Sequence, residues 1–244
     1  MKGPVSTALL LAAGKGSRFT PQGEAIPKCM IEVGGISILQ RLFDNLRAHG
    51  ISRLVIVTGF MQERVRRFAT GIASTIELVF VDNADYATTN NIYSLWMARH
   101  HIHEPFLLIE SDLIFNGGLL TDMLVPDTIA VSEILPWMNG TTVTLDDHDT
   151  VESFHLIGQK NQPGRYKTVN IYCLSLSSWN KVVVSLDQYI ASGRTDVYYE
   201  MVFYELADSG DLQLTAVTFP CSEWYEIDTV SDQTAANRLI PSWR

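Results

Sequence analysis

The sequence lacks the features that would place the chain in a membrane, in an oxidising compartment or on a nucleic acid. Its 244 residues include only three cysteines, Cys29, Cys173 and Cys221, an odd number without metal-binding spacing. Reduced thiols in a cytoplasmic protein are therefore expected. No apolar run approaches the ~20 residues that span a bilayer. The formal net charge of −9 argues against nucleic acid or an anionic membrane as a partner.

Signs of disorder and of modular organisation are also missing. There is no internal repeat, low-complexity tract or Pro/Gly/Ser-rich linker, and 46% of the residues are hydrophobic. A chain of this size and composition can bury a core. We therefore expect a single domain over residues 1–244. An insertion of antiparallel strands at about 133–172 is expected to form the acceptor side of a cleft.

Strand and helix patterns alternate along the first half of the chain. Strands are predicted at 7–13, 53–57, 75–81 and 106–109, and helices at 36–49, 61–68 and 90–100. This alternation indicates an α/β fold in which helices cover both faces of a parallel sheet. In the second half, strands are predicted at 129–132, 167–174 and 212–219, a hairpin at 141–156, and helices at 177–191, 197–207 and 231–239.

The first predicted strand runs into a basic glycine loop. Gly14 and Gly16 follow the strand, and Lys15, Arg18 and Lys28 supply positive charge. Backbone N–H groups exposed in such a loop can hold an anion, and glycine lets a phosphate approach the backbone. The loop is not a Walker A motif and lacks the third glycine of G-x-G-x-x-G. An ordinary turn with chance basic residues is the alternative to a polyphosphate cradle.

Two aspartates follow predicted strands and could hold a metal ion. Asp112 comes just after the strand at 106–109, and Asp228 ends a short strand in which Glu226 lies on the same face. Ligands of open parallel sheets bind beyond the carboxyl ends of the strands, where carboxylates suit Mg²⁺. Capping roles are the alternative: Asp112 for a turn, and Asp228 for the helix predicted from 231.

Five motifs resemble a known superfamily. The run LLAAGKGSR at 10–18 with PK at 27–28 resembles the signature of nucleotidyltransferases of the MobA and sugar-phosphate NTP-transferase type. TNNIYSL at 89–95, ESD at 110–112, DVYYE at 196–200 and YEID at 225–228 are similar to the branch acting on phosphocholine and 2-aminoethylphosphonate. The resemblance implies a three-layer α/β/α Rossmann-like fold with a mostly parallel mixed sheet. It also implies CTP as donor, Mg²⁺ as cofactor and a zwitterionic phosphate or phosphonate acceptor.

The resemblance and the chemistry of the residues together suggest a role for each candidate site residue. Arg18 and Lys28 would be catalytic and would neutralise the phosphates, and Asp112 and Asp228 would hold the metal. The nucleotide would be bound by Leu11, Ala12, Ala13, Gly14, Gly16, Ser17, Arg18, Lys28, Asn83, Asn91 and Ser94. The acceptor would be bound by Asp196, Tyr198, Trp137, Lys160 and Glu226.

The chemistry of the acceptor side is consistent with an amine. Carboxylates and aromatic faces both hold ammonium groups. Both kinds are supplied on the expected acceptor side by Asp196, Tyr198, Tyr199, Glu200, Trp137 and Trp224, and of these Asp196 and Tyr198 match the branch motif. A core role explains the aromatic residues equally well. The stretch 134–142, where a choline cage would be completed, does not match, which favours a primary amine such as 2-aminoethylphosphonate or phosphoethanolamine. Lys160 and Lys167 are candidates for binding the acceptor phosphate.

The predicted reaction needs no protein nucleophile, since the acceptor anion can attack the α-phosphorus directly and expel pyrophosphate. The alternatives are a sugar-1-phosphate nucleotidyltransferase, which would share the opening motif, and an inactive nucleotide-binding sensor. The expected partners are thus CTP and a small phosphorylated or phosphonate amine. A homodimer is compatible with the sequence, which does not determine the oligomeric state.

Overall fold

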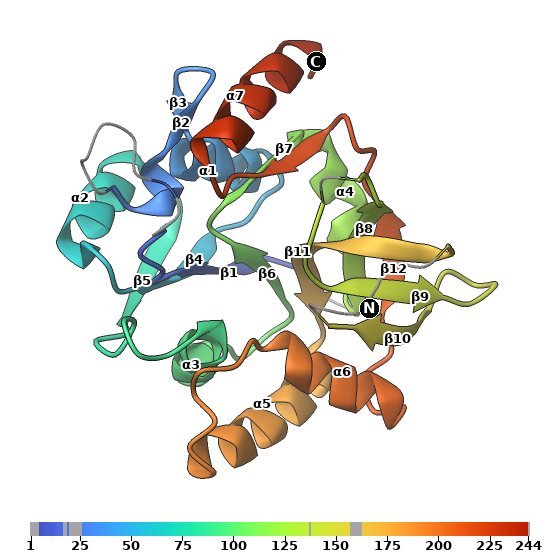
Figure 1. The fold of residues 1–244 in the computed structure, drawn as a ribbon. Coiled ribbons are helices and arrows are strands. Elements are labelled where there is room, and N and C mark those ends of the chain that lie inside the picture. Colours follow the sequence, from blue (N-terminus) through green and yellow to red (C-terminus); the bar gives the residue numbers. More distant parts are fainter. Residues whose placement is uncertain (1–4, 17–18, 20–25, 137, 157–162, 244) are drawn as a thin grey trace.

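The computed structural model describes residues 5–16, 19, 26–136, 138–156 and 163–243. Nine strands form one central sheet with the order β10-β9-β11-β6-β1-β4-β5, and β8 joins β11 and β12 (Figure 1). The strands are β1 (Thr7–Ala12), β4 (Arg53–Thr58), β5 (Glu77–Asp82), β6 (Phe106–Glu110), β8 (Thr128–Glu133), β9 (Thr142–Leu145), β10 (Val151–His155), β11 (Arg165–Leu174) and β12 (Thr215–Thr218).

The parallel half of the sheet is covered by helices on both faces, as the alternation of patterns predicts. Strands β6, β1, β4 and β5 are parallel, and β1 is buried throughout. Ala8 and Leu10 pack with helices α1 and α2, while Leu9 and Leu11 pack with α3, α5 and α6 on the other face (Figure 1). The helices are α1 (Ile38–Ala48), α2 (Gln62–Ile72), α3 (Asn91–Met97), α5 (Leu176–Ala191) and α6 (Glu200–Asp208). The expected three-layer α/β/α fold is confirmed.

Strand β11 joins the antiparallel part to the parallel part. Its first residues pair with β9 and its last residues pair with β6, both antiparallel. The pairing with β8 shifts register between Thr168 and Tyr172, where Asn170 has a φ of 59°. Strands β9 and β10 form the hairpin predicted at 141–156. Through β11 these two strands continue the main sheet.

Several element boundaries differ from the predictions. The helix predicted from 36 begins at Ile38, because Ser37 caps it by accepting a hydrogen bond from the Gln40 N–H. The helix predicted from 197 begins only at Glu200. The predictions omitted the short elements β2 (Glu32–Val33), β3 (Ile36–Ser37), β7 (Leu113–Phe115) and α4 (Leu120–Met123).

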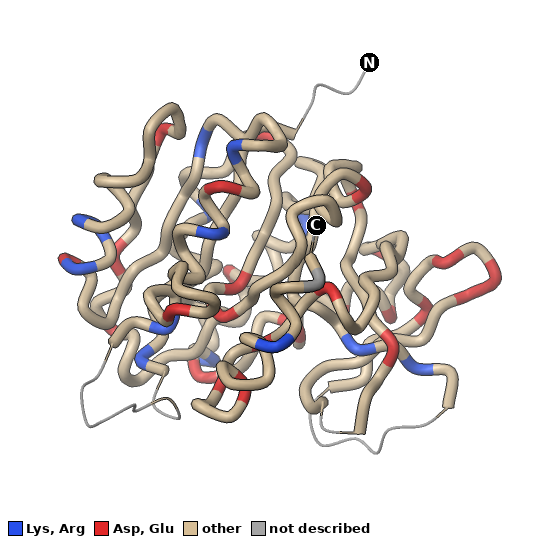
Figure 2. Tube along the Cα trace, turned by 90° about the horizontal axis from the view of Figure 1, so that it is seen from above, with Lys and Arg blue, Asp and Glu red and all other residues tan. Residues whose placement is uncertain are grey.

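The C-terminal part packs against the opening part of the chain. β13 (Trp224–Glu226) pairs with β7, and α7 (Val230–Leu239) lies beside β2, where the Gln233 side chain donates to the Glu32 carbonyl at 2.6 Å. No helix in the described ranges is long and apolar enough to cross a membrane. In the view of Figure 2, Lys and Arg positions are interleaved with Asp and Glu positions along the trace.

Candidate active site

A cavity of about 560 Å³ opens at the carboxyl ends of the parallel strands. Leu11 and Ala13 line it at the end of β1, Asn83 just after β5, and Glu110 at the end of β6. This is the location predicted for ligands of an open parallel sheet. The structure brings twelve of the predicted site residues to this cavity: Leu11, Ala13, Gly14, Gly16, Lys28, Asn83, Asn91, Ser94, Asp112, Tyr198, Glu226 and Asp228.

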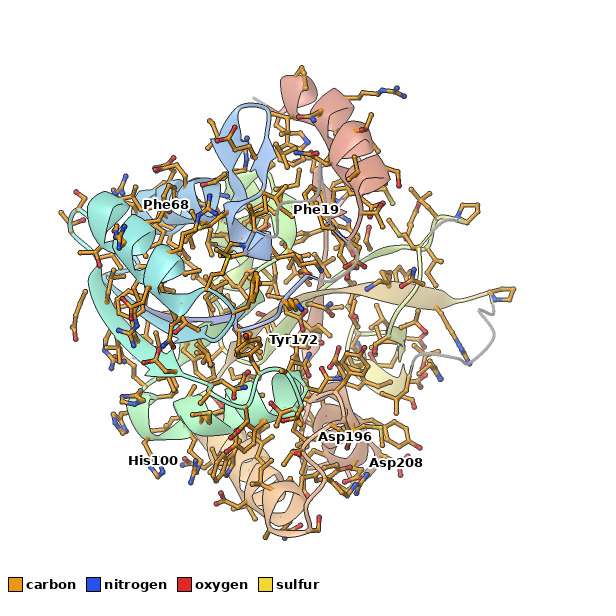
Figure 3. All side chains as sticks on the ribbon, turned by 60° about the vertical axis from the view of Figure 1, so that its left-hand side comes forward. Phe19, Phe68, His100, Tyr172, Asp196 and Asp208 are labelled. Atoms are coloured by element: carbon orange, nitrogen blue, oxygen red, sulfur yellow. The ribbon has the colours of Figure 1, made fainter. Side chains whose placement is uncertain are left out.

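Two predicted site residues lie elsewhere. The Ala12 side chain points away from the cavity into the core under α1, because successive residues of a strand face opposite sides. Asp196 was predicted to bind the acceptor, but it is exposed on the α5–α6 connection (Figure 3), outside the cavity. Its carbonyl accepts a hydrogen bond from the Asn90 side chain at 3.3 Å, so the residue holds this connection against α3. The predictions for Ser17, Arg18, Trp137 and Lys160 fall outside the described residues.

The glycine loop lets Lys28 reach the cavity. Gly16 has a φ of 60°, and a Cβ at this position would lie 3.0 Å from Cγ of Lys28. Glycine is therefore required both by the backbone conformation and by the close approach of the lysine stem. Lys28 begins a short 3₁₀ turn, and the next residue, Cys29, is buried in the core. Burial raises the pKa of the Cys29 thiol to about 12, which makes it an apolar anchor of the turn.

Lys28 lies between the two predicted metal ligands. Its Nζ is 2.6 Å from Oδ2 of Asp112 and 2.5 Å from Oδ1 of Asp228. Burial alone would lower the pKa of this ammonium, but the charges and hydrogen bonds of the two carboxylates outweigh burial and raise the pKa. Lys28 is therefore a fixed positive charge at the centre of the site.

The pairing of β7 with β13 brings the two aspartates together across the chain. Asp112 directly precedes β7, and the Ile227 N–H donates to its carbonyl at 2.8 Å. The capping role considered for Asp228 belongs to its neighbour, since the Thr229 side chain caps α7 in a capping box with Asp232. The Asp228 carboxylate is thus directed to the cavity and not to the helix end.

The donor set at this position fits a hard divalent cation. Carboxylate oxygens of Asp112, Glu226 and Asp228 lie within 4.8 Å of one another. Oδ1 of Asp112 is buried and has no hydrogen-bond partner among the described residues. Mg²⁺ takes oxygen ligands of this kind and completes its shell with substrate phosphates and water.

A second pair of opposite charges lies beside this cluster. Nζ of Lys167, a residue only 2% exposed, is 3.8 Å from Oε2 of Glu226 and donates to the Thr168 carbonyl at 2.7 Å. Burial raises the pKa of Glu226 to about 7; the Lys167 charge opposes this change, and the nearby Asp112 and Asp228 charges add to it. Glu226 therefore connects the aspartate cluster electrostatically with Lys167.

Asn91 organises the opposite wall of the cavity. Its side-chain amide donates to Oε1 of Glu110 at 3.1 Å, and its carbonyl oxygen accepts from the Tyr199 N–H at 3.0 Å. Burial raises the pKa of Glu110 well above its ordinary value, and the charges of Asp112, Glu200 and Glu226 raise it further. Asn91 thus ties the end of β6 to the start of α6.

Asn83 and Ser94, both predicted to bind the nucleotide, hydrogen bond to each other at the cavity wall. The Asn83 amide donates to Oγ of Ser94 at 3.1 Å and to Oγ1 of Thr89 at 3.3 Å, and its Oδ1 accepts from the Asp85 N–H at 2.9 Å. Both residues are buried. Their contacts hold the loop between β5 and α3 in place, so part of their role is to shape the wall.

Some cavity residues were not predicted as site residues. Glu110 and Glu200 stand in the two motifs ESD and DVYYE, and Asn170 lies at the register shift of β11. Glu110 could have been predicted as a site residue, because it is a carboxylate at the end of an apolar strand. Glu200 was among the carboxylates considered for the acceptor side, but Asp196 was chosen, since DVYYE gives no hint of which carboxylate faces inward. Nothing local marks Asn170, because its conformation depends on the pairing of three strands.

Comparison with known proteins identifies the class to which this site belongs. Residues 8–126 match the model of the MobA-like NTP transferase domain. A CMP-5'-(3-aminopropyl)phosphonate synthase of Streptomyces rubellomurinus is 29% identical over 241 residues, which is 94% of this chain and 38% of that protein. A choline-phosphate cytidylyltransferase of Streptococcus pneumoniae is 24% identical over 239 residues, covering 96% of this chain and 97% of the relative.

Solved structures share the fold. The CTP:phosphocholine cytidylyltransferase of Streptococcus pneumoniae superposes with a TM-score of 0.84 at 21% identity, covering 98% of this chain and all of the other. The inositol-1-phosphate CTP transferase of T. maritima has a TM-score of 0.79 at 19% identity, and the match covers 99% of this chain and 97% of the other. These relatives and structural neighbours are nucleotidyltransferases. The match to the MobA-like NTP transferase domain covers about half of this chain, and the curated relatives match the cytidylyltransferase branch that the motifs resemble.

Proposed function

We propose that this chain is a CTP-dependent cytidylyltransferase that transfers CMP to the phosphonate or phosphate group of a small amine-bearing acceptor. The observation that carries the proposal is the convergence of the glycine loop, Lys28 and the Asp112–Asp228 pair at one cavity. The Streptomyces and Streptococcus relatives support CTP as donor and a phosphonate or phosphate as acceptor. The chain spans only 38% of the first of these relatives, so the full activity of that protein is not carried over.

The transfer would proceed in line at the α-phosphorus. An acceptor oxygen forms a bond to this phosphorus while the bond to the β-phosphate oxygen breaks, and pyrophosphate leaves. The N–H groups around Gly14 and Gly16 would hold the triphosphate, together with the predicted Arg18. Lys28 would neutralise the charge that develops at the α-phosphate, so the protein contributes position and charge and no nucleophile.

A magnesium ion is the cofactor that we assign to this reaction. Asp112 and Asp228 would hold it, with Glu226 at its border. When bound, the ion supplies Lewis-acid polarisation of the phosphoryl oxygens. Because Lys28 hydrogen bonds one oxygen of each aspartate, its ammonium must share these carboxylates with the metal or turn toward the phosphate when the metal binds.

Lys167 is the residue that we assign to the anionic end of the acceptor. It is buried at the cavity wall next to Glu226, and a Cβ on Gly140 would lie 3.1 Å from its Nζ. Glycine at 140 leaves the ammonium accessible from that side. A phosphonate or phosphate oxygen placed there would have both Lys167 and the metal as counter-charges.

The experiment is a pyrophosphate-release assay with Mg²⁺, four NTPs and a panel of phosphonate, phosphocholine-type and sugar-1-phosphate acceptors. We expect turnover with CTP and an amine-bearing acceptor. Turnover with sugar phosphates alone would indicate the sugar-1-phosphate alternative, and nucleotide binding without turnover would indicate the sensor. Asp112→Ala should abolish release, whereas Asp122→Ala, an exposed position on α4, should leave it unchanged.

A further inference from the structure

The described lining of the cavity holds more acidic than basic side chains. Five carboxylates face two lysines there: Glu110, Asp112, Glu200, Glu226 and Asp228 against Lys28 and Lys167. Lys28 is paired with two of the aspartates, and Lys167 is paired with Glu226. Glu110 and Glu200 make no ion pair within the described part of the chain. The imbalance is therefore local to the wall formed by the end of β6 and the start of α6.

Glu200 is buried there without a full set of hydrogen-bond partners. The residue is 5% exposed, and its Oε2 has no hydrogen-bond partner among the described residues. Lys167 is near enough to act on its charge but is not in ion-pair contact. A buried carboxylate oxygen without a donor costs free energy in the empty protein. A ligand that brings N–H donors would remove this cost.

We propose that Glu200 and Glu110 form the binding site for the ammonium group of the acceptor and select a primary ammonium over a trimethylammonium. The inference rests on the proposed function and names the end of the acceptor that this wall recognises. A primary ammonium offers three N–H donors, which the oxygens of Glu200 and Glu110 can accept. A trimethylammonium offers none and is held by aromatic faces instead.

The neighbouring groups support this choice. Asn91 donates to Oε1 of Glu110, which fixes the orientation of that carboxyl group. The rings of Tyr172 and Tyr199 are fully buried and pack edge to face with each other at 6.0 Å between centroids, so their faces serve the core. Tyr172 lies at the middle of the molecule in Figure 3. Neither ring lines the cavity; Tyr198 does, and beside it Glu200 and Glu110 present carboxyl oxygens.

The arrangement of charges also matches a zwitterion of short length. Nζ of Lys167 is 3.8 Å from Oε2 of Glu226, and Lys167 lines the same cavity as Glu200. An acceptor with its anionic group at Lys167 and the metal would place its ammonium group at Glu200. The site would therefore be complementary to both ends of an aminoalkyl phosphonate or phosphate.

The first test compares acceptors on the wild-type enzyme. 2-Aminoethylphosphonate is paired with ethylphosphonate, which lacks only the amine, and phosphoethanolamine is followed through its mono-, di- and trimethyl derivatives. We expect kcat/KM to be about 10- to 100-fold lower without the amine. It should also fall with successive N-methylation. Equal turnover of the amine-free compound, or preference for the trimethyl compound, would overturn the ammonium site while leaving the proposed function intact.

The second test uses Glu200→Gln, which keeps the shape and removes the charge. We expect KM for 2-aminoethylphosphonate to rise by about 10- to 100-fold with little change in kcat, and kcat/KM for ethylphosphonate to stay as it is. Glu200→Asp should recover part of the loss. Glu152→Gln, at an exposed position on β10, is the matched control.

Three results would count against the inference. An equal loss for the amine-bearing and amine-free acceptors would show a structural role for Glu200. An unchanged KM for the amine-bearing acceptor would show that its ammonium group binds elsewhere. Absence of pyrophosphate release with every acceptor would overturn the proposed function and this assignment with it.

Discussion

The Glu200→Gln substitution should stabilise the ligand-free protein at high pH. Burial raises the pKa of Glu200 from its ordinary 4.5 to about 7, while hydrogen bonding from its own backbone and Asn91 and the Lys167 charge oppose this change. At pH values between these two pKa values, Glu200 keeps its proton in the folded state and has released it in the unfolded state. Raising the pH through this window therefore favours unfolding of the wild-type protein.

The size of the effect follows from the two pKa values. A difference from 4.5 to about 7 corresponds to about 3 kcal/mol of lost stability, at ~1.36 kcal/mol per tenfold change. Glutamine does not ionise, so the variant escapes this loss. We expect the free energy of unfolding of the variant relative to the wild type to increase by about 2–3 kcal/mol between pH 5 and pH 8.

Urea unfolding without ligands at pH 5, 6, 7 and 8 measures this difference. Glu152→Gln corrects for the general effect of removing one charge from an acidic protein, because that residue is exposed. A difference that is independent of pH, or that becomes smaller as the pH rises, would refute the reasoning. A gain in stability together with a loss of acceptor binding would be the trade-off expected of a residue buried for function.

Three further predictions concern the nucleotide side of the cavity. Lys28→Met should abolish turnover but strengthen Mn²⁺ binding in the absence of nucleotide, measured by electron paramagnetic resonance, because Asp112 and Asp228 lose their ammonium partner; an unchanged Mn²⁺ affinity would contradict the assignment of the metal site. Asp112→Asn should weaken Mn²⁺ binding at least about tenfold, whereas comparable binding would place the ion elsewhere. Gly16→Ala should reduce kcat/KM at least about tenfold with an unchanged circular dichroism spectrum, since φ is 60° and the added Cβ meets Lys28; near-normal activity would show that the loop adjusts.

Local patterns in the sequence were sufficient to predict the α/β/α layers of the fold and the principal charged residues of the site. The apolar run of β1, the glycine loop and the carboxylates after apolar strands are all properties of short segments. They predict that the glycine loop and Asp112 meet at one edge of a parallel sheet, because parallel strands end at the same edge. They also predict Asp228 as a second carboxylate at this site. The structure places the side chains of Lys28, Asp112 and Asp228 in contact there.

Which carboxylate of the run DVYYE lines the cavity depended on tertiary structure. The run DVYYE contains two carboxylates, Asp196 and Glu200, and its sequence does not determine which one faces the cavity. Helix α6 begins at Glu200, where the preceding Tyr199 N–H donates to the Asn91 side chain of α3. This contact joins residues more than a hundred positions apart, and it turns Glu200 inward while Asp196 stays exposed.

The sequence by itself determined that a basic glycine loop and two strand-end aspartates lie at one edge of a parallel sheet. Only the tertiary structure decided that Lys28 bridges these aspartates, through the pairing of β7 with β13, and that Glu200 lines the cavity while Asp196 lies outside it. The physical reason is the range of the interactions. Periodicity and turn chemistry act over a few residues, whereas strand pairing and side-chain contacts between distant segments set which charges meet.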